Sequence, residues 1–119
     1  MRYVDGFLIP VPKKKLRAYQ RIAQKAGRVW MKHGALQYCE TVGDDLRIPK
    51  VASFPKTVRT KPGETVVFSW IVYRSKAHRD QVNKKVMKDP VLLKMMTADS
   101  HPFDIKRMNY GGFRTLVDM

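Results

Sequence analysis

The chain has a single cysteine, Cys39, among its 119 residues. No disulfide can form within one chain, and a zinc site built from several cysteines is excluded. No apolar run approaches the roughly 20 residues that a membrane-spanning helix needs. The apolar opening, residues 1–12, is interrupted by Asp5 and precedes its lysines, whereas a secretory signal carries its charges first. We therefore expect a cytoplasmic protein with no membrane segment.

Acidic residues are also scarce, since ten Asp and Glu stand against 24 Lys and Arg, for a net charge of +14 at pH 7. Such a charge attracts polyanions such as nucleic acid or anionic lipid, without choosing between them. The composition, 44% hydrophobic and 29% charged, is typical of a globular protein. No internal repeat, low-complexity tract or linker divides the chain, so we expect one domain, residues 1–119.

Motifs for metals and cofactors are missing as well. The three histidines, His33, His78 and His101, lie far apart, and no pair has the spacing of metal ligands on a helix. The stretch "YGGF" lacks the length and the lysine of a phosphate-binding loop. We therefore expect neither a metal nor a cofactor.

The residues that are present alternate between strand and helix patterns. Residues 2–11 and 64–73 have strand-like alternation, and apolar residues recur at three- and four-residue steps from about Lys13 to Gly34. A second strand is expected at 35–42, a long polar connection at 43–63, a helix capped by Ser75 that runs to about residue 88, and a helical turn after Asp89 and Pro90. We expect Pro10 and Pro12 to end the first strand, and a bulge at Gly111 and Gly112 to kink the last.

The order βαββαβ predicts a ferredoxin-like α+β fold, in which two helices cover one face of a four-stranded antiparallel sheet. Residues 64–73 are largely apolar on both sides, with Val66, Phe68, Trp70 and Val72 facing one way and Val67, Ser69, Ile71 and Tyr73 the other. Two helices cannot cover both sides, and a bare apolar sheet is rare on a soluble monomer. We therefore predict a homodimer in which two sheets face each other, a dimeric α/β barrel.

Several stretches also resemble the YbaA-like family of small bacterial proteins of unknown function, within the dimeric α/β-barrel superfamily. The resemblance rests on "YVDGFLIPVP", "GRVWMKHGALQY", "SFPKTV", "ETVVFSWIVYRSKAHRDQVN", "VMKDP" and "KRMNYGGF", in that order along the chain. It implies a ferredoxin-like fold and a homodimer. It implies no activity, because fold alone transfers none.

A candidate pocket in the barrel is expected from the polar and aromatic groups nearest the best-defined strand: Asp5, Trp70, Tyr73, His78 and Arg79. A buried Asp5 would have a raised pKa and could act as an acid or base; the alternative is a carboxylate that is hydrogen-bonded at the barrel mouth. His78 could be a general base, or a histidine that helps to pack the start of its helix. Tyr110 and the glycine pair after it could let a ligand approach the backbone, although a structural bulge is favoured.

A row of basic side chains is the second candidate site. Six of them lie within an arc of roughly 80° on the expected first helix: Lys14, Arg17, Arg21, Lys25, Arg28 and Lys32. They could follow the phosphates of a nucleic acid, or simply form the solvated outer face of an amphipathic helix. The second interpretation is favoured because no nucleic-acid-binding module and no aromatic row accompany them. Nonspecific binding of nucleic acid at low salt is still expected.

Two functions are therefore open. The leading hypothesis is a protein that binds or transforms a small, partly apolar molecule in a dimeric barrel. The alternative is the binding of RNA or another polyanion through the basic surface. A closed cavity would support the first hypothesis, and a continuous positive surface over both subunits would support the second.

Overall fold

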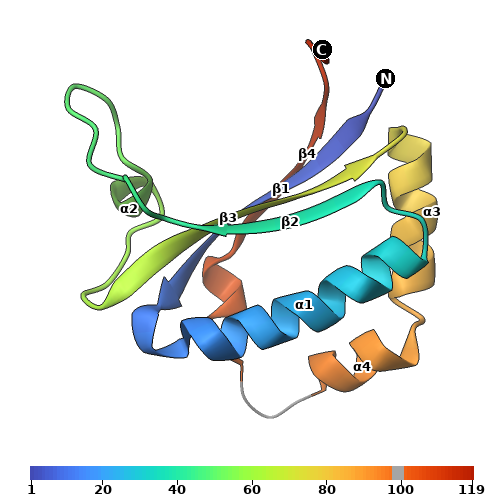
Figure 1. Ribbon diagram of the computed structural model, residues 1–119, viewed down its shortest axis with the longest axis horizontal. Helices are drawn as coiled ribbons and strands as arrows, with labels where there is room; N and C mark the ends of the chain where they lie inside the picture. Colours follow the sequence, from blue (N-terminus) through green and yellow to red (C-terminus); the bar gives the residue numbers. More distant parts are fainter. Residues whose placement is uncertain (98–100) are drawn as a thin grey trace.

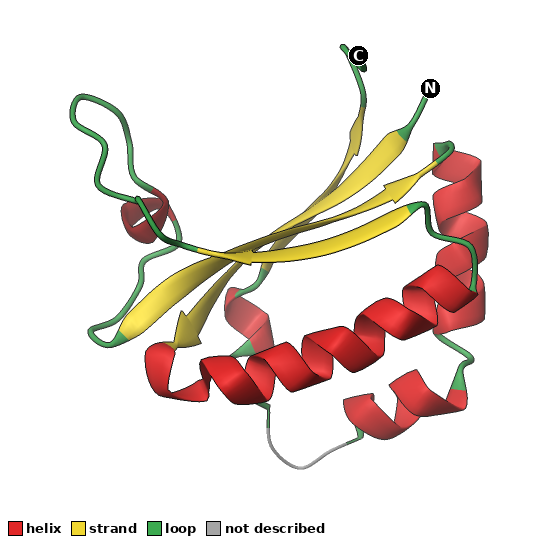
Figure 2. Ribbon diagram, in the orientation of Figure 1, coloured by secondary structure: helices red, strands yellow, loops and turns green. Residues whose placement is uncertain are grey.

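A computed structural model describes residues 1–97 and 101–119. Four antiparallel strands form one sheet in the order β2-β3-β1-β4, with β1 at Tyr3–Pro12, β2 at Gln37–Val42, β3 at Glu64–Tyr73 and β4 at Asn109–Arg114. Three helices lie on one side of this sheet (Figures 1 and 2): α1 at Leu16–Lys32, α3 at Lys76–Val86 and α4 at Pro90–Met96. This is the expected ferredoxin-like arrangement.

Three shorter elements complete the chain. The 3-10 turns η1, Lys13–Lys15, and η2, Ile105–Arg107, precede α1 and β4. The four-residue helix α2, Phe54–Thr57, lies within the connection between β2 and β3, on the side of the sheet away from the other helices. It was not expected from the sequence, although Ser53 caps it by accepting a hydrogen bond from the backbone N–H of Lys56.

The ends of the longer helices follow the cap residues that the sequence shows. Ser75 Oγ accepts a hydrogen bond of 3.0 Å from the backbone N–H of His78. Asp89 Oδ1 accepts one of 2.9 Å from Val91, with Pro90 in the first turn of α4. Gly34 follows α1 with a φ of +114°, a conformation that favours glycine after a helix. Local chemistry therefore sets the starts of α3 and α4 and the end of α1.

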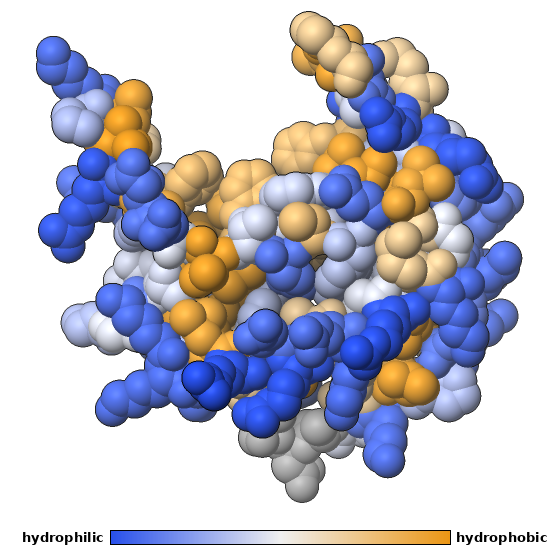
Figure 3. All heavy atoms as spheres, in the orientation of Figure 1, coloured by the Kyte–Doolittle hydropathy of each residue, from blue (hydrophilic) through white to orange (hydrophobic). Residues whose placement is uncertain are grey.

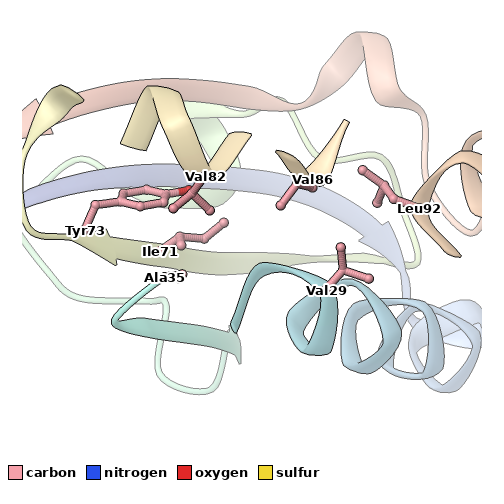
Figure 4. Close-up of a cluster of buried hydrophobic side chains, with 7 residues drawn as sticks. All are labelled: Val29, Ala35, Ile71, Tyr73, Val82, Val86 and Leu92. Atoms are coloured by element: carbon pink, nitrogen blue, oxygen red, sulfur yellow. The ribbon is translucent and has the colours of Figure 1, made fainter. Parts of the chain in front are cut away.

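The core lies between the sheet and the helices. One cluster of buried side chains joins β3 to all three long helices (Figure 4): Val29, Ala35, Ile71, Tyr73, Val82, Val86 and Leu92. A second cluster lies under the first half of α1: Ile9, Val11, Tyr19, Ala23 and Val67. The two sets of β3 residues face opposite sides, as expected, and the set that begins at Val67 is the one that faces the helices.

The expectation for the end of the first strand is partly wrong. β1 ends at Pro12, as expected, but Pro10 lies inside the strand and pairs with Val66 of β3. Among the described residues, β4 pairs with β1 only as far as Leu8, so one side of β1 has no neighbouring strand at Pro10 and the proline interrupts no ladder of hydrogen bonds.

The expected bulge at Gly111 and Gly112 is also absent. These glycines pair in uninterrupted register with Gly6 and Asp5 of β1. Neither has a positive φ, so the backbone conformation of β4 does not explain them.

An ion pair fixes the segment before β4 to the start of β3. The Arg107 guanidinium donates hydrogen bonds of 2.7 and 2.8 Å to the two carboxylate oxygens of Glu64, and another of 2.9 Å to the carbonyl of Arg59. The hydrogen bonds from Arg107 lower the pKa of Glu64 to about 2, from 4.5. Because the folded pKa is depressed, this stabilisation is complete above pH 4.5 and is lost as the pH falls through about 2.

We predict that Glu64→Gln destabilises the protein at neutral pH, and that the difference from wild type shrinks as the pH falls below 4.5 toward 2. Urea denaturation at a series of pH values measures the difference in the free energy of unfolding between the two proteins. Asp44→Asn, in an exposed loop, is the control and should match wild type throughout. A destabilisation by Glu64→Gln that stays constant down to about pH 3 would contradict the assigned pKa.

Candidate functional site

The five residues of the expected pocket lie on two sides of the sheet. Asp5 pairs with Ile71 and Tyr3 pairs with Tyr73, so Asp5 and Tyr73 face the helices, as do His78 and Arg79 from α3. Trp70 pairs with Gly6 and lies on the opposite face. This corrects the expectation of one pocket. Trp70 and Tyr73 lie three positions apart on β3, and residues an odd number of positions apart on a strand face opposite sides of the sheet.

The structure brings Asp5, Tyr73 and Arg79 together with two tyrosines, Tyr3 and Tyr110, and we call these five residues the Asp5 site. Asp5 is 1% exposed. Its Oδ1 lies 3.8 Å from Arg79 Nε, and neither atom makes a hydrogen bond within the described residues. Arg79 instead donates from Nη2 to the Tyr3 hydroxyl at 3.2 Å and from Nη1 to the Tyr110 hydroxyl at 3.3 Å. A buried carboxylate oxygen and a buried guanidinium Nε atom therefore lie close together without a hydrogen bond between them.

Burial decides the titration of the Asp5 site. Desolvation raises the pKa of Asp5, and the charge of Arg79 and the hydroxyls of Tyr110 and Tyr73 only partly oppose it. Desolvation and the charge of Asp5 also raise the pKa of Tyr73, whose hydroxyl donates to Asn83 Oδ1 at 3.3 Å. A carboxyl group with a raised pKa can accept or donate a proton nearer neutrality than an ordinary one.

Glycine makes room for this arrangement. A Cβ atom at Gly112, which pairs with Asp5, would collide with the ring of Tyr3. The Tyr3 ring can lie there only because residue 112 has no side chain, and this position brings its hydroxyl to Arg79. The Arg79 guanidinium lies 5.1 Å from the centre of the same ring.

His78 has a structural environment. Its Nδ1 accepts a hydrogen bond of 3.0 Å from the backbone N–H of Arg74, and its ring lies edge-on to Tyr73 at 6.0 Å. Burial, followed by the nearby charge of Arg74, lowers the pKa of His78. The neutral ring packs the start of α3, and with Nδ1 already hydrogen-bonded it is a poor candidate for a general base.

The face of the sheet away from α1, α3 and α4 is the open face, and we define it by these strand residues: Val4, Gly6, Leu8, Pro10, Pro12, Gln37, Cys39, Thr41, Glu64, Val66, Phe68, Trp70, Val72, Asn109, Gly111 and Phe113. Among them only Glu64, at the start of β3, carries a formal charge, and it is ion-paired with Arg107. Phe68 and Phe113 are 44% and 61% exposed. The segment before α2 and the two termini project on this side, and the surface between them is indented (Figures 1 and 3).

A hollow of about 350 Å³ lies on the open face, where β1 and β4 meet. Gly6 and Gly111 pair directly and form its floor. Side chains around them include Leu8, Phe68 and Phe113, and Asn109 supplies an amide. The hollow is thus mostly apolar, and it exists because two opposed positions lack side chains.

Sequence reasoning missed much of both sites. Tyr3, Gly6, Asn109 and Phe113 were not singled out, although Tyr110 and the glycine pair were. The alternation of β1 already placed Tyr3 beside Asp5. What the sequence lacked was the register of β4, which decides that Gly111 opposes Gly6 and that Gly112 opposes Asp5.

The six basic residues lie where the helical pattern predicts. Every one of these side chains on η1 and α1 is exposed: Lys14, Arg17, Arg21, Lys25, Arg28 and Lys32. Hydrophilic side chains cover α1 in Figure 3. The apolar stripe of α1 packs against the sheet, with Tyr19, Ala23 and Val29 buried.

Within residues 1–97 and 101–119, no three His, Cys, Asp or Glu side chains converge as metal ligands. No helix in this described part of the chain is long and apolar enough to cross a membrane.

A family model described as "Protein of unknown function (DUF1428)" matches residues 2–105. The chain belongs to this family.

Relatives in the DUF1428 family include the uncharacterized protein YbaA of Escherichia coli K12, which is 44% identical over 118 residues and 99% of each chain. YbaA of Shigella flexneri is equally similar. The family resemblance expected from the sequence is therefore confirmed.

Solved structures show the fold alone. A NIPSNAP domain protein from Burkholderia xenovorans has a TM-score of 0.55 at 12% identity, over 95% of this chain and 93% of its own. A dimeric ferredoxin-like protein from an uncultured marine organism has a TM-score of 0.50 at 15% identity, over 100% and 98%. These likenesses agree with the ferredoxin-like fold of this DUF1428 chain.

Proposed function

We propose that the protein is a two-fold homodimer that binds a small, partly apolar molecule in the hollow on its open face. The observation that carries this proposal is the glycine floor. The paired sheets of the dimer would enclose the hollow, and the molecule would lie inside the resulting barrel.

The fold does not need a glycine at position 111. Its φ is not positive, and a Cβ there would meet only the ring of Phe113, at 3.8 Å, an ordinary contact. Glycine inside a strand nevertheless costs about 0.5–1 kcal/mol relative to alanine. Such glycines often mark a place where a ligand or another backbone approaches closely. The space above Gly111 and Gly6 is therefore best explained by something that occupies it.

The hollow also has a polar side chain at its wall, that of Asn109. Asn109 Nδ2 donates to the carbonyls of Leu8 and Arg107, at 3.4 and 3.3 Å. Within the described residues, its carbonyl oxygen accepts no hydrogen bond. An apolar molecule with a single N–H or O–H donor matches these walls and this acceptor, since small-molecule sites commonly combine apolar walls with few polar groups.

A second copy of the chain is the partner that best suits the open face. With a net charge of +14, two copies repel each other over most of their surfaces, whereas the open face carries only Glu64, which is ion-paired with Arg107 at its edge. The segments that project beside it carry exposed apolar side chains, among them Val51, Leu116 and Val117. One solved structure of similar fold is described as dimeric, which supports the same assembly.

We predict that the protein sediments as a dimer at micromolar concentration and that Phe68→Asp abolishes the dimer. A charge at this position would be buried between the sheets without a partner. Val91→Asp is the control, because Val91 is similarly exposed, 49% against 44%, but lies on α4. A well-folded wild-type monomer, or a Phe68→Asp dimer as tight as wild type, would contradict the assembly.

We predict that Gly111→Ala leaves the fold and the dimer intact but weakens binding in the hollow at least tenfold, because the methyl group occupies the floor. Indole, an apolar ring with one N–H donor, serves as the probe, and its affinity is measured by NMR titration. Cys39→Ala, on the open face outside the hollow, should bind indole as wild type does.

Mass spectrometry under mild conditions can also detect a small molecule that co-purifies with the protein. We expect such a molecule in wild type and not in Gly111→Ala. Equal affinity of wild type and Gly111→Ala for indole would reject the hollow as the site. Dissociation of the dimer in Gly111→Ala would show instead that the hollow receives a side chain of the second copy.

The basic row on α1 supports a second candidate function, the binding of a polyanion. The specific observation is that all six basic side chains are exposed on the outer side of α1. They would hold phosphates by charge alone, with little preference for sequence.

We predict that RNA binds at low salt and that its affinity falls by orders of magnitude between about 50 and 200 mM salt. Replacing Arg21, Lys25 and Arg28 together by Gln should abolish this binding and leave stability nearly unchanged, since exposed charges contribute little. Replacing three lysines away from α1, Lys56, Lys61 and Lys106, is the charge-matched control. Tight binding of one defined RNA at physiological salt would make this the primary function.

A further inference from the structure

We infer that the Asp5 site is a second binding site, which takes the hydroxyl group of a small molecule in the gap between Asp5 Oδ1 and Arg79 Nε. This site lies on the face of the sheet opposite the hollow and does not depend on the function proposed above.

One oxygen atom beside the two groups can bridge them. Asp5 Oδ1 and Arg79 Nε are 3.8 Å apart, too far for a direct hydrogen bond. An oxygen atom placed between them and slightly to one side can lie about 2.8 Å from both. Both atoms are buried and neither has a hydrogen-bond partner within the described residues. Unpaired buried polar atoms are rare in native proteins, and here two of them face the same gap.

The chemistry of the two groups selects the ligand. Arg79 Nε–H only donates, and the Asp5 carboxylate only accepts. An atom that serves both must accept one hydrogen bond and donate another, which a hydroxyl does and an ether or ketone oxygen does not. A carboxylate would be repelled by Asp5, and an ammonium group by Arg79. Asp80 also lies 3.3 Å from Arg79 Nε, so the positive charge of Arg79 is already matched by carboxylates, and the site favours a neutral alcohol or phenol.

The site is close to solvent on the side of β4. Tyr110 is 49% exposed, and the Arg79 side chain is 18% exposed where it reaches from α3 to the hydroxyls of Tyr3 and Tyr110. Phe7 stacks on Tyr110 at 4.8 Å, so the wall beside the gap is aromatic. A ligand could leave its carbon skeleton against these rings and insert only its hydroxyl group.

A water molecule also accepts and donates, and it is the competing occupant. Removing a carboxylate and part of a guanidinium from water is unfavourable, and apolar side chains fill such a space at lower cost. If Asp5 and Arg79 had a purely structural role, apolar side chains at these two positions would stabilise the fold better. A buried carboxyl group with a raised pKa beside a specific charged partner is a common feature of functional sites.

The first test compares three probes that share a benzene ring: phenol, anisole and benzoate. Binding to the wild-type dimer is followed through the ¹⁵N and ¹H resonances of the Arg79 Nε–H group. We expect phenol to shift these resonances in a saturable way, while anisole, which cannot donate, and benzoate, which is charged, do not. Equal effects of anisole or benzoate would overturn the hydroxyl assignment. No effect of any probe would mean a bound water only, and would overturn the site.

Two matched variants then locate the binding. Asp80 also lies near Arg79 Nε, at 3.3 Å, but its side chain is 60% exposed and outside the gap. We expect Asp5→Asn to weaken phenol binding at least tenfold and Asp80→Asn to leave it unchanged. If Asp5→Asn does not fold, the comparison of phenol, anisole and benzoate on the wild-type protein still tests the inference. Equal phenol affinity of a folded Asp5→Asn variant would overturn the inference, whereas indole binding in the hollow should survive it.

Discussion

The sheet of this protein has more apolar surface than its own helices can cover, and the rest of the architecture depends on this imbalance. Val67, Ile71 and Tyr73 of β3 pack under α1 and α3, while Phe68 and Trp70 point away from them. The small helix α2 reaches this second face only at one end, where Phe54 packs edge-on to Phe68. The remaining apolar surface stays exposed in a single chain, and this is the reason for the proposal that a second copy covers it.

The elements could be predicted from sequence because their causes are local. The two-sided apolar pattern of β3, the caps Ser75 and Asp89, and the glycine after α1 each act within a few residues of where they stand. The helix α2 was missed because a four-residue helix has no periodicity to detect, and its cap Ser53 lies in a polar connection. Local signals of this kind decide which elements form, but they do not decide how strands align.

The sites could be predicted only in part because they depend on strand register. Asp5 and Trp70 looked like neighbours from the sequence, yet pairing of Trp70 with Gly6 places them on opposite faces. The glycine pair at 111 and 112 suggested a bulge, since a bulge is the usual local reason for such residues. In the structure, each glycine is explained by a different contact with residues far away in the sequence. The absence of a side chain at Gly112 makes room for the Tyr3 ring, and at Gly111 it makes room for the hollow.

Both sites meet at the contact between β1 and β4, and this has a mechanical consequence. β4 is an edge strand, hydrogen-bonded to β1 on one side only. On the helix side, Arg79 links Tyr110 of β4 to α3. On the open side, Gly111 and Phe113 form part of the hollow. Because consecutive residues of one strand face opposite sides, a shift of β4 that closes one site must move the wall of the other. The two sites therefore share one edge strand, and Tyr110 of this strand takes part in both.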